Sequence, residues 1–179
     1  MAAFIVLPGI GGSGETHWQS HWQSGDPSFK RFQPADWDRP DPADWTRALE
    51  AAIDASGQPP VLLAHSLACL LVAHAARGIA GRIRGAFLVA VPDPDGPAFP
   101  AEAAGFRHVP SRALPFPALI VASADDPYGS LDHARKRARD WDAGIVEIGD
   151  RGHINGASNL GAWRQGRMLL DAFCAGLRA

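Results

Sequence analysis

The sequence has little cysteine, and this scarcity argues against a fold held together by disulfides. Cysteine accounts for 2 of its 179 residues. Both Cys69 and Cys174 lie in apolar stretches, where a cysteine usually packs as a small hydrophobic side chain. We therefore expect a reducing compartment, and the localisation that follows is cytoplasmic.

Long apolar runs and an excess of basic residues are also missing. No stretch approaches the roughly 20 apolar residues that a membrane-spanning helix needs. Residues 1–9 lack the positive segment of a signal peptide. The 17 basic and 19 acidic side chains leave a formal net charge of −2. Because phosphate binding needs a clear basic surplus, no nucleic acid is expected as a partner. Without a long apolar run, no membrane is expected either.

The composition does provide enough apolar material for one globular domain. Hydrophobic residues make up 46% of the chain and charged residues 20%. A chain of this length corresponds to about one typical domain and buries roughly 70% of its unfolded surface. We therefore expect a single domain over residues 1–179 that needs no structural metal.

Short apolar runs alternate with longer helical patterns, which is typical of an α/β domain with a parallel sheet. The predicted strands are residues 3–7, 29–33, 61–64, 85–91, 118–122 and 144–148. The predicted helices are residues 15–23, 42–55, 67–77, 131–140 and 160–177. Asp41 before Pro42 is the expected N-cap of the second helix. Seven prolines predict a long loop at residues 92–117. The expected architecture is a three-layer α/β/α sandwich around a mostly parallel six-stranded sheet.

A serine follows the third predicted strand at the point where a helix begins. Ser66 has Ala64 and Ala68 two residues away on either side. A nucleophile elbow requires such an arrangement, because its sharp turn leaves room only for small side chains at those two positions. The familiar pattern has glycine at both. A serine at this place could also be a simple helix N-cap.

Two aspartates and a histidine follow two later predicted strands. Asp125 and Asp126 come after strand 118–122, and His153 comes after strand 144–148. The carboxyl ends of parallel strands meet at one edge of a sheet, where open α/β sheets place their sites. The chain order Ser, Asp, His is that of the α/β-hydrolases. The sequence therefore predicts a serine hydrolase site at this edge.

Several segments together resemble the small α/β-hydrolases of the YdeN and retinoblastoma-binding-protein type, which lack a lid domain. The matching segments, spread over nearly the whole chain, are residues 7–12, 16–19, 64–68, 114–117, 122–128 and 152–155. The resemblance implies a minimal α/β-hydrolase without a lid. It also implies Ser66 as nucleophile, Asp126 as the triad acid and His153 as base. The alanine pair around Ser66 departs from the family pattern.

These residues allow a mechanism to be written. Neutral His153 would take the proton of Ser66 as the serine attacks an acyl carbon, and ionised Asp126 would orient the imidazole. The oxyanion needs backbone donors, one after the nucleophile and one from the glycine-rich loop after the first strand. The candidate donors are the N–H groups of Leu67, Ile10 and Gly11. This chemistry needs no cofactor and no metal.

Neighbouring residues leave alternatives open. Asp125 could be the triad acid, with Asp126 as a turn residue. His65 is expected to be structural, because adjacent strand residues point to opposite faces. His17 and Trp18 are possible substrate-side residues, since the loop after the first strand would bring them near the nucleophile.

Two other motifs offer rival interpretations. Residues 9–14 match the G-x-G-x-x-G pattern of dinucleotide-binding domains, and Asp36 stands about where that pattern needs an acidic residue. A proline interrupts its strand-to-glycine turn, and this interpretation leaves the Ser, Asp and His placements unexplained. His17 and His21 have the spacing of zinc ligands on a helix, but Gln19 replaces the glutamate of that motif.

The predicted function is hydrolysis of a small ester or related acyl substrate through a Ser-Asp-His triad and an acyl-enzyme intermediate. Without a lid the site would be open, with acyl specificity set by residues 92–117 and by the region of Trp18 and Trp22. The expected apolar wall residues are Phe99, Phe106 and Phe116. The alternative from another class is a non-catalytic protein-interaction module on a hydrolase scaffold, which leaves a protein partner open.

Overall fold

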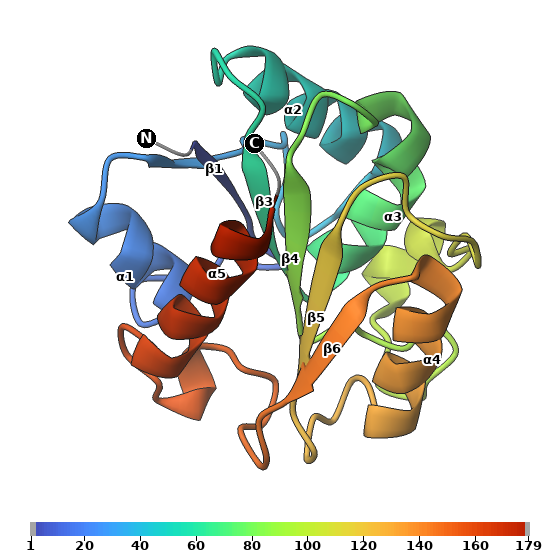
Figure 1. The fold of residues 1–179 in the computed structure, drawn as a ribbon. Coiled ribbons are helices and arrows are strands. Elements are labelled where there is room, and N and C mark those ends of the chain that lie inside the picture. Colours follow the sequence, from blue (N-terminus) through green and yellow to red (C-terminus); the bar gives the residue numbers. More distant parts are fainter. Residues whose placement is uncertain (1–2, 178–179) are drawn as a thin grey trace.

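A six-stranded sheet with helices on both faces forms the fold (Figure 1). The computed structural model describes residues 3–177. The strands lie in the order β2-β1-β3-β4-β5-β6, and every neighbouring pair is parallel. The predicted three-layer α/β/α architecture is therefore confirmed.

Most strands are short apolar runs that lead into a helix. The strands are β1 (Phe4–Leu7), β2 (Phe29–Arg31), β3 (Val61–His65), β4 (Gly85–Val89), β5 (Ala118–Ala122) and β6 (Gly144–Glu147). The α-helices are α1 (Trp18–Gly25), α2 (Pro42–Asp54), α3 (Leu67–Ile79), α4 (Leu131–Trp141) and α5 (Arg164–Gly176). Two short 3₁₀ helices, η1 (Ala101–Phe106) and η2 (Gly156–Ser158), lie in loops. Within residues 3–177, no helix is long and apolar enough to cross a membrane.

Side chains that alternate along β1 pack into two separate cores, one on each face of the sheet. Ile5 and Leu7 belong to the core that also contains residues of α2, α3 and α4. Phe4 and Val6 belong to the core that contains residues of α1 and α5. Strand β3 is buried along its whole length between these cores, as expected for a central strand covered on both faces.

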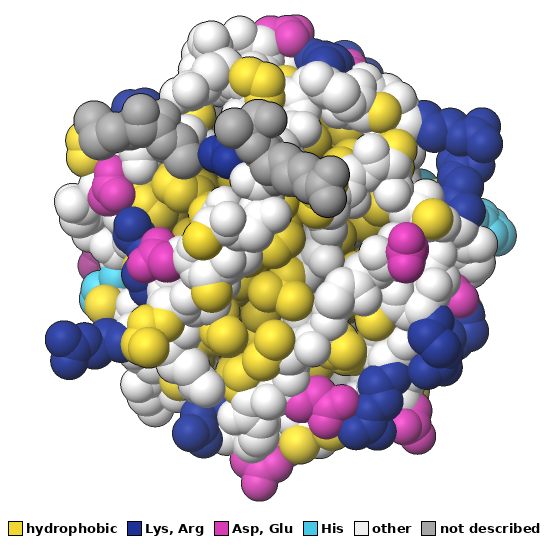
Figure 2. All heavy atoms as spheres, in the orientation of Figure 1, with side chains coloured by type: hydrophobic (Ala, Val, Ile, Leu, Met, Phe, Trp, Pro, Cys, Tyr) yellow, Lys and Arg dark blue, Asp and Glu magenta, His cyan; other side chains and the backbone are white. Residues whose placement is uncertain are grey.

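The sheet face that α5 covers has hydrophobic side chains that are only partly buried. Figure 2 shows hydrophobic side chains gathered in the middle of this face, with many of the lysine and arginine side chains toward its edge. Leu119 of β5, Val146 of β6 and Phe173 of α5 are only partly buried there. The polar residues that follow the strands lie elsewhere, at the carboxyl edge of the sheet.

Several element boundaries differ from the predicted ones, two of them for clear local reasons. The helix predicted from residue 15 begins at Trp18, because His17 is its N-cap and accepts a hydrogen bond from the Gln19 N–H. The strand predicted to reach residue 91 ends at Val89, and Ala90 has a left-handed φ of 57°. A residue in that conformation cannot continue a strand.

The predicted start of the second helix and the predicted loop at residues 92–117 agree with the structure. Asp41 caps α2 as expected, since its carboxylate accepts a hydrogen bond from the Asp44 N–H. Residues 92–117 contain no α-helix or strand, although η1 lies within them. The last helix starts at Arg164 rather than at residue 160.

Candidate active site

Ser66 lies in a strained turn between β3 and α3. Its backbone angles are φ 54° and ψ −124°, and such conformations cost about 1–3 kcal/mol. Ala64 and Ala68 are fully buried on either side of the turn. A Cβ on Gly9, in the loop after β1, would lie 3.0 Å from the Ser66 Cβ. This crowding explains why small residues surround the serine.

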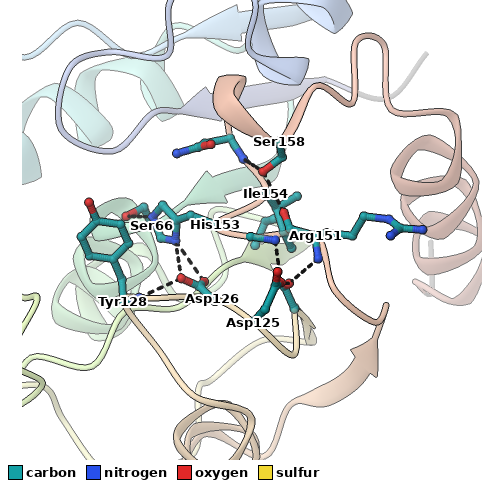
Figure 3. Close-up of polar contacts among 12 residues, drawn as sticks. Ser66, Asp125, Asp126, Tyr128, Arg151, His153, Ile154 and Ser158 are labelled. Atoms are coloured by element: carbon teal, nitrogen blue, oxygen red, sulfur yellow. Dashed lines mark hydrogen bonds and ion pairs between the residues drawn. The ribbon is translucent and has the colours of Figure 1, made fainter.

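The side chains of Ser66, His153 and Asp126 form a continuous chain of hydrogen bonds (Figure 3). The Ser66 Oγ lies 2.8 Å from the His153 Nε2. The His153 Nδ1 lies 2.9 Å from each carboxylate oxygen of Asp126. The His153 and Asp126 side chains are 9% and 2% exposed. Because Nδ1 faces a carboxylate it carries a proton, which leaves Nε2 to accept the serine hydroxyl.

Three separate strands bring this group together. Ser66 directly follows β3, Asp126 lies in the loop after β5, and His153 lies in the loop after β6. All three strands run parallel, so their carboxyl ends meet at one edge of the sheet. The Tyr128 N–H donates a hydrogen bond of 2.9 Å to the Asp126 Oδ1, which fixes the orientation of the carboxylate.

Asp125 supports the surrounding loops and has no hydrogen bond to His153. Its Oδ1 accepts hydrogen bonds from the Ser123 Oγ at 2.8 Å and from the Gly152 N–H at 2.7 Å. These two bonds hold the pKa of the Asp125 carboxyl below its ordinary value. Position therefore distinguishes the two aspartates: Asp126 faces the imidazole, and Asp125 ties the loop after β5 to the loop that carries His153.

His65 contacts the site, and the expectation that it points away is wrong. Its Nε2–H donates a hydrogen bond of 2.9 Å to the backbone carbonyl of His153. The two rings lie edge to face, with centroids 4.9 Å apart. Strand alternation stops at Ser66, whose positive φ turns the chain so that both residues border the same pocket. Burial, and then the charge of His17 and of His153, lowers the pKa of His65 well below its ordinary value.

His17 precedes α1 and borders the same pocket. Its Nδ1 accepts a hydrogen bond of 3.2 Å from the Gln19 N–H, so the proton of the neutral ring is on Nε2. That nitrogen is buried and has no hydrogen-bond partner within residues 3–177. Burial, followed by the charges of Arg31 and His153, lowers the pKa of His17 to about 3. The ring is therefore neutral at physiological pH.

Trp18 is not among the residues around the pocket, and its expected substrate-side position is wrong. Trp18 follows His17 directly, and each residue of an α-helix is rotated about 100° around the axis from the one before. The Trp18 side chain therefore points in a different direction from that of His17. Its indole N–H donates a hydrogen bond of 2.9 Å to the carbonyl of Ile154, and its ring packs against Trp22 and Trp163. Trp18 therefore supports the loop that carries His153 from the core side of that loop.

A cavity of about 350 Å³ lies beside Ser66 and His153. Its lining residues are Ile10, Gly11, Ser13, Gly14, His17, His65, Ser66, Leu67, Pro92, Phe99, Pro100, Tyr128, His153, Asn155, Gly156 and Ala157. Of the three expected wall phenylalanines, Phe99 lines the cavity, but Phe106 and Phe116 are buried in the core. Phe106 ends η1 and packs 5.8 Å from the ring of Trp45, so it is turned toward α2.

Gln19 holds the loop after β1 and is the supporting residue that the sequence analysis missed. Its amide donates hydrogen bonds to the carbonyls of Leu7 at 3.2 Å and Leu63 at 2.9 Å. Its Oε1 accepts a hydrogen bond of 2.7 Å from the Ser13 hydroxyl. The available signal was a polar residue three positions before Trp22, on the face of the helix that packs inward.

The backbone donors of this loop are not equivalent. The Gly11 N–H donates a hydrogen bond of 3.1 Å to the carbonyl of Trp37, so it is already occupied. A Cβ on Gly9 would lie 3.4 Å from the Leu67 backbone nitrogen, which brings the loop close to the start of α3. Of the two loop candidates, Ile10 is therefore the better placed to share an oxyanion with Leu67.

The same geometry disfavours the two rival interpretations. The glycine-rich loop packs against the serine turn through Gly9, and the Asp36 carboxylate accepts hydrogen bonds from two backbone N–H groups within its own turn. His17 is buried whereas His21 is exposed. In the part of the chain that the structure describes, no three His, Cys, Asp or Glu residues are grouped to hold a metal.

Comparison with known proteins agrees with the fold. The serine hydrolase family matches residues 4–172. A search of curated protein sequences found no significant match. A solved structure described as a YdeN-like hydrolase from Pectobacterium atrosepticum is 30% identical, covers 98% of this chain and 91% of its own, and has a TM-score of 0.88.

Two more distant structures share the fold. The ydeN gene product of B. subtilis is 16% identical, with coverage of 98% of this chain and 100% of its own and a TM-score of 0.77. A monoacylglycerol lipase from Paleococcus ferrophilus is 11% identical, with coverage of 96% and 93% and a TM-score of 0.71. Since the family match spans nearly the whole chain, this protein belongs to the serine hydrolase family.

Proposed function

We propose that the protein hydrolyses a small ester or a related acyl compound through an acyl-enzyme formed on Ser66. The observation that carries this proposal is the hydrogen-bonded chain from the Ser66 Oγ through His153 to Asp126, with contacts of 2.8 and 2.9 Å. Such a chain activates a serine hydroxyl whose free pKa is far too high for it to ionise unaided.

In the first step the Ser66 Oγ attacks the acyl carbon and its proton moves to the His153 Nε2. Ionised Asp126 keeps Nδ1 protonated and stabilises the imidazolium. His153 then gives the proton to the leaving alcohol as the acyl-enzyme forms. A water molecule then loses a proton to His153 and attacks the same carbon. As the bond to Oγ breaks, His153 returns this proton to the Ser66 Oγ, which releases the acid and restores the free enzyme.

The oxyanion of each tetrahedral intermediate would accept hydrogen bonds from the backbone N–H groups of Leu67 and Ile10. Leu67 is the first residue of α3, where a backbone N–H has no partner within the helix. The close approach of Gly9 to Ser66 supports the pairing of these donors. Donors of this kind are worth about 3 kcal/mol each in the transition state.

The size of the site favours small substrates. A cavity of about 350 Å³ is at the lower end of the range of roughly 300–1,000 Å³ found for ligand pockets. The fold is shared with an esterase domain from Rhodothermus marinus at 16% identity and with the lipase named above. Ester hydrolysis is therefore the first reaction to test.

The test is labelling of the purified protein with a fluorophosphonate probe, with short-chain p-nitrophenyl esters assayed in parallel. The parent should label and hydrolyse these esters, whereas Ser66→Ala and His153→Ala should do neither. Circular dichroism melting of each variant separates loss of chemistry from loss of fold. A well-folded parent that neither labels nor hydrolyses any ester would contradict the proposal and favour the protein-interaction module.

A further inference from the structure

The pocket at Ser66 has two walls of different chemistry. The first, here called the apolar wall, consists of Pro92, Phe99 and Pro100 from the loop after β4. The second, here called the polar wall, comes from the segment after β1 and the loop that carries His153. Its members are Ser13, Gly14, His17, Asn155 and Gly156, and the same two segments also contribute Gly11 and the apolar residues Ile10 and Ala157 to the lining.

Strand order puts these walls on opposite sides of the serine. Strands β1 and β4 flank β3 on its two sides, so the loops that follow them approach Ser66 from opposite directions. The loop that carries His153 joins the β1 side, because a Cβ on Gly156 would lie 2.7 Å from the Thr16 Oγ1. On the β4 side, the Asp93 N–H donates a hydrogen bond of 2.8 Å to the Tyr128 carbonyl.

The polar wall contains a donor without an acceptor. His17 is buried, with only 5% of its surface exposed. Its Nε2 has no hydrogen-bond partner among residues 3–177. The cap bond from the Gln19 N–H occupies Nδ1 and puts the ring proton on Nε2. An unsatisfied buried donor is unfavourable. Nε2 is closed off from the cavity, but the His17 ring borders it, so a small shift of the surrounding wall on substrate binding would let an acceptor on the substrate satisfy this donor.

Formal charge is absent from both walls. None of the lining residues within the described part of the chain is Asp, Glu, Lys or Arg. A charged group on the substrate would lose its hydration without gaining a partner ion, which is unfavourable. The pocket therefore suits an uncharged molecule.

The position of His153 orients that molecule. His153 must protonate the leaving alcohol, so the alcohol lies beside its Nε2. The same loop supplies Asn155 and Gly156 of the polar wall, two and three residues further on. The alcohol is thus directed to the polar wall. The acyl chain then lies against the apolar wall that contains Phe99.

We propose that the substrate is an uncharged ester of a short, apolar acid with an alcohol that carries hydroxyl groups. One hydroxyl oxygen of the alcohol accepts a hydrogen bond from the His17 Nε2–H. This inference rests on the hydrolase activity proposed above and adds to it the chemistry of the two halves of the substrate.

Three uncharged esters test it. Glyceryl monobutyrate and propyl butyrate have the same acid and the same alcohol length, and differ by two hydroxyl groups on the alcohol. Propyl 2,3-dihydroxybutanoate is an isomer of the first, with both hydroxyls moved to the acid. We expect kcat/KM for glyceryl monobutyrate to exceed that for propyl butyrate about tenfold, the effect of one or two neutral hydrogen bonds. The isomer should gain no such advantage.

The variant pair is His17→Asn and His21→Asn. Asparagine is a favoured N-cap, so the first variant keeps an acceptor for the Gln19 N–H but has no donor at the position of Nε2. We expect it to reduce the preference for the glyceryl ester to about threefold or less. His21 is exposed on the same helix, and its replacement should keep the tenfold preference. Fluorophosphonate titration of Ser66 normalises each rate to the amount of folded site.

The outcomes separate the two proposals. An enzyme that hydrolyses these esters without preferring the glyceryl compound would overturn the inference about the substrate and leave the hydrolase activity intact. An undiminished preference in His17→Asn, or equal rates for the two isomers, would overturn it as well. A folded protein that neither reacts with the fluorophosphonate probe nor hydrolyses any ester would instead contradict the hydrolase proposal itself.

Discussion

The Nε2–H of His65 donates a hydrogen bond of 2.9 Å to the backbone carbonyl of His153. His65 directly precedes Ser66, so the residue before the proposed nucleophile holds the loop that carries the proposed base. Burial lowers the pKa of His65 well below its ordinary value, so the ring stays neutral and adds no charge beside an imidazolium. We regard His65 as a positioning residue.

Replacing His65 with Phe should therefore lower kcat and leave KM nearly unchanged. The variant keeps a ring of similar size but cannot donate to the His153 carbonyl. A neutral hydrogen bond is worth about 1 kcal/mol, so we expect kcat to fall roughly fivefold to tenfold. Steady-state kinetics from pH 5 to 9 would check this, and His65→Gln, which retains a donor, should recover part of the loss.

The two neighbouring aspartates should respond differently to the same change. Asp126→Asn should lower kcat about 10⁴-fold, as the corresponding change does in serine proteases, because an amide favours the wrong histidine tautomer. Asp125→Asn should keep most of the activity and lower the melting temperature, since its bonds join two loops. Measuring kcat and the melting temperature of both variants checks this prediction. Equal losses of kcat would contradict the assignment of Asp126.

A methyl group added at Gly9 should damage the site without unfolding the protein. The new Cβ would lie 3.0 Å from the Ser66 Cβ and 3.2 Å from the His65 carbonyl, so the loop or the serine turn must move. Displacements of about 1 Å in a catalytic group can cost roughly 100-fold in rate. We expect Gly9→Ala to lose activity on that scale. Gly25→Ala is the control, because a Cβ there meets nothing within 4 Å and should leave the rate unchanged.

Acid should destabilise the fold through His17. Its pKa is lowered from 6.5 to about 3 in the folded protein, so between these values the unfolded chain binds a proton that the folded chain does not. Stability linked to His17 is therefore complete above pH 6.5 and is lost as the pH falls toward 3.

Urea unfolding at several pH values between 4.5 and 6.5 would measure this effect. His17→Asn should reduce the slope of unfolding free energy against pH by about 1.4 kcal/mol per pH unit near pH 5. His21→Asn, changed at an exposed position of the same helix, should leave the slope as it is. An unchanged slope in His17→Asn would mean that the ring is protonated in the folded state.

Apolar runs and chain order were enough to predict the sheet and the group of candidate residues. Runs such as the one in β3 are apolar throughout because both faces of a central parallel strand are covered. Ser66, the aspartate pair and His153 could be assigned to one edge because parallel strands all end on the same side. None of these conclusions depends on how any single side chain is oriented.

The tertiary structure decided the questions that do depend on orientation. Asp126 rather than Asp125 meets His153 because of the turn after β5, which no periodicity describes. His65 enters the site because the positive φ of Ser66 breaks strand alternation. Trp18 is turned to the core by its place one residue after a helix cap. Local pattern predicts an element, whereas the direction of a side chain at its end is set by contacts between segments far apart in the chain.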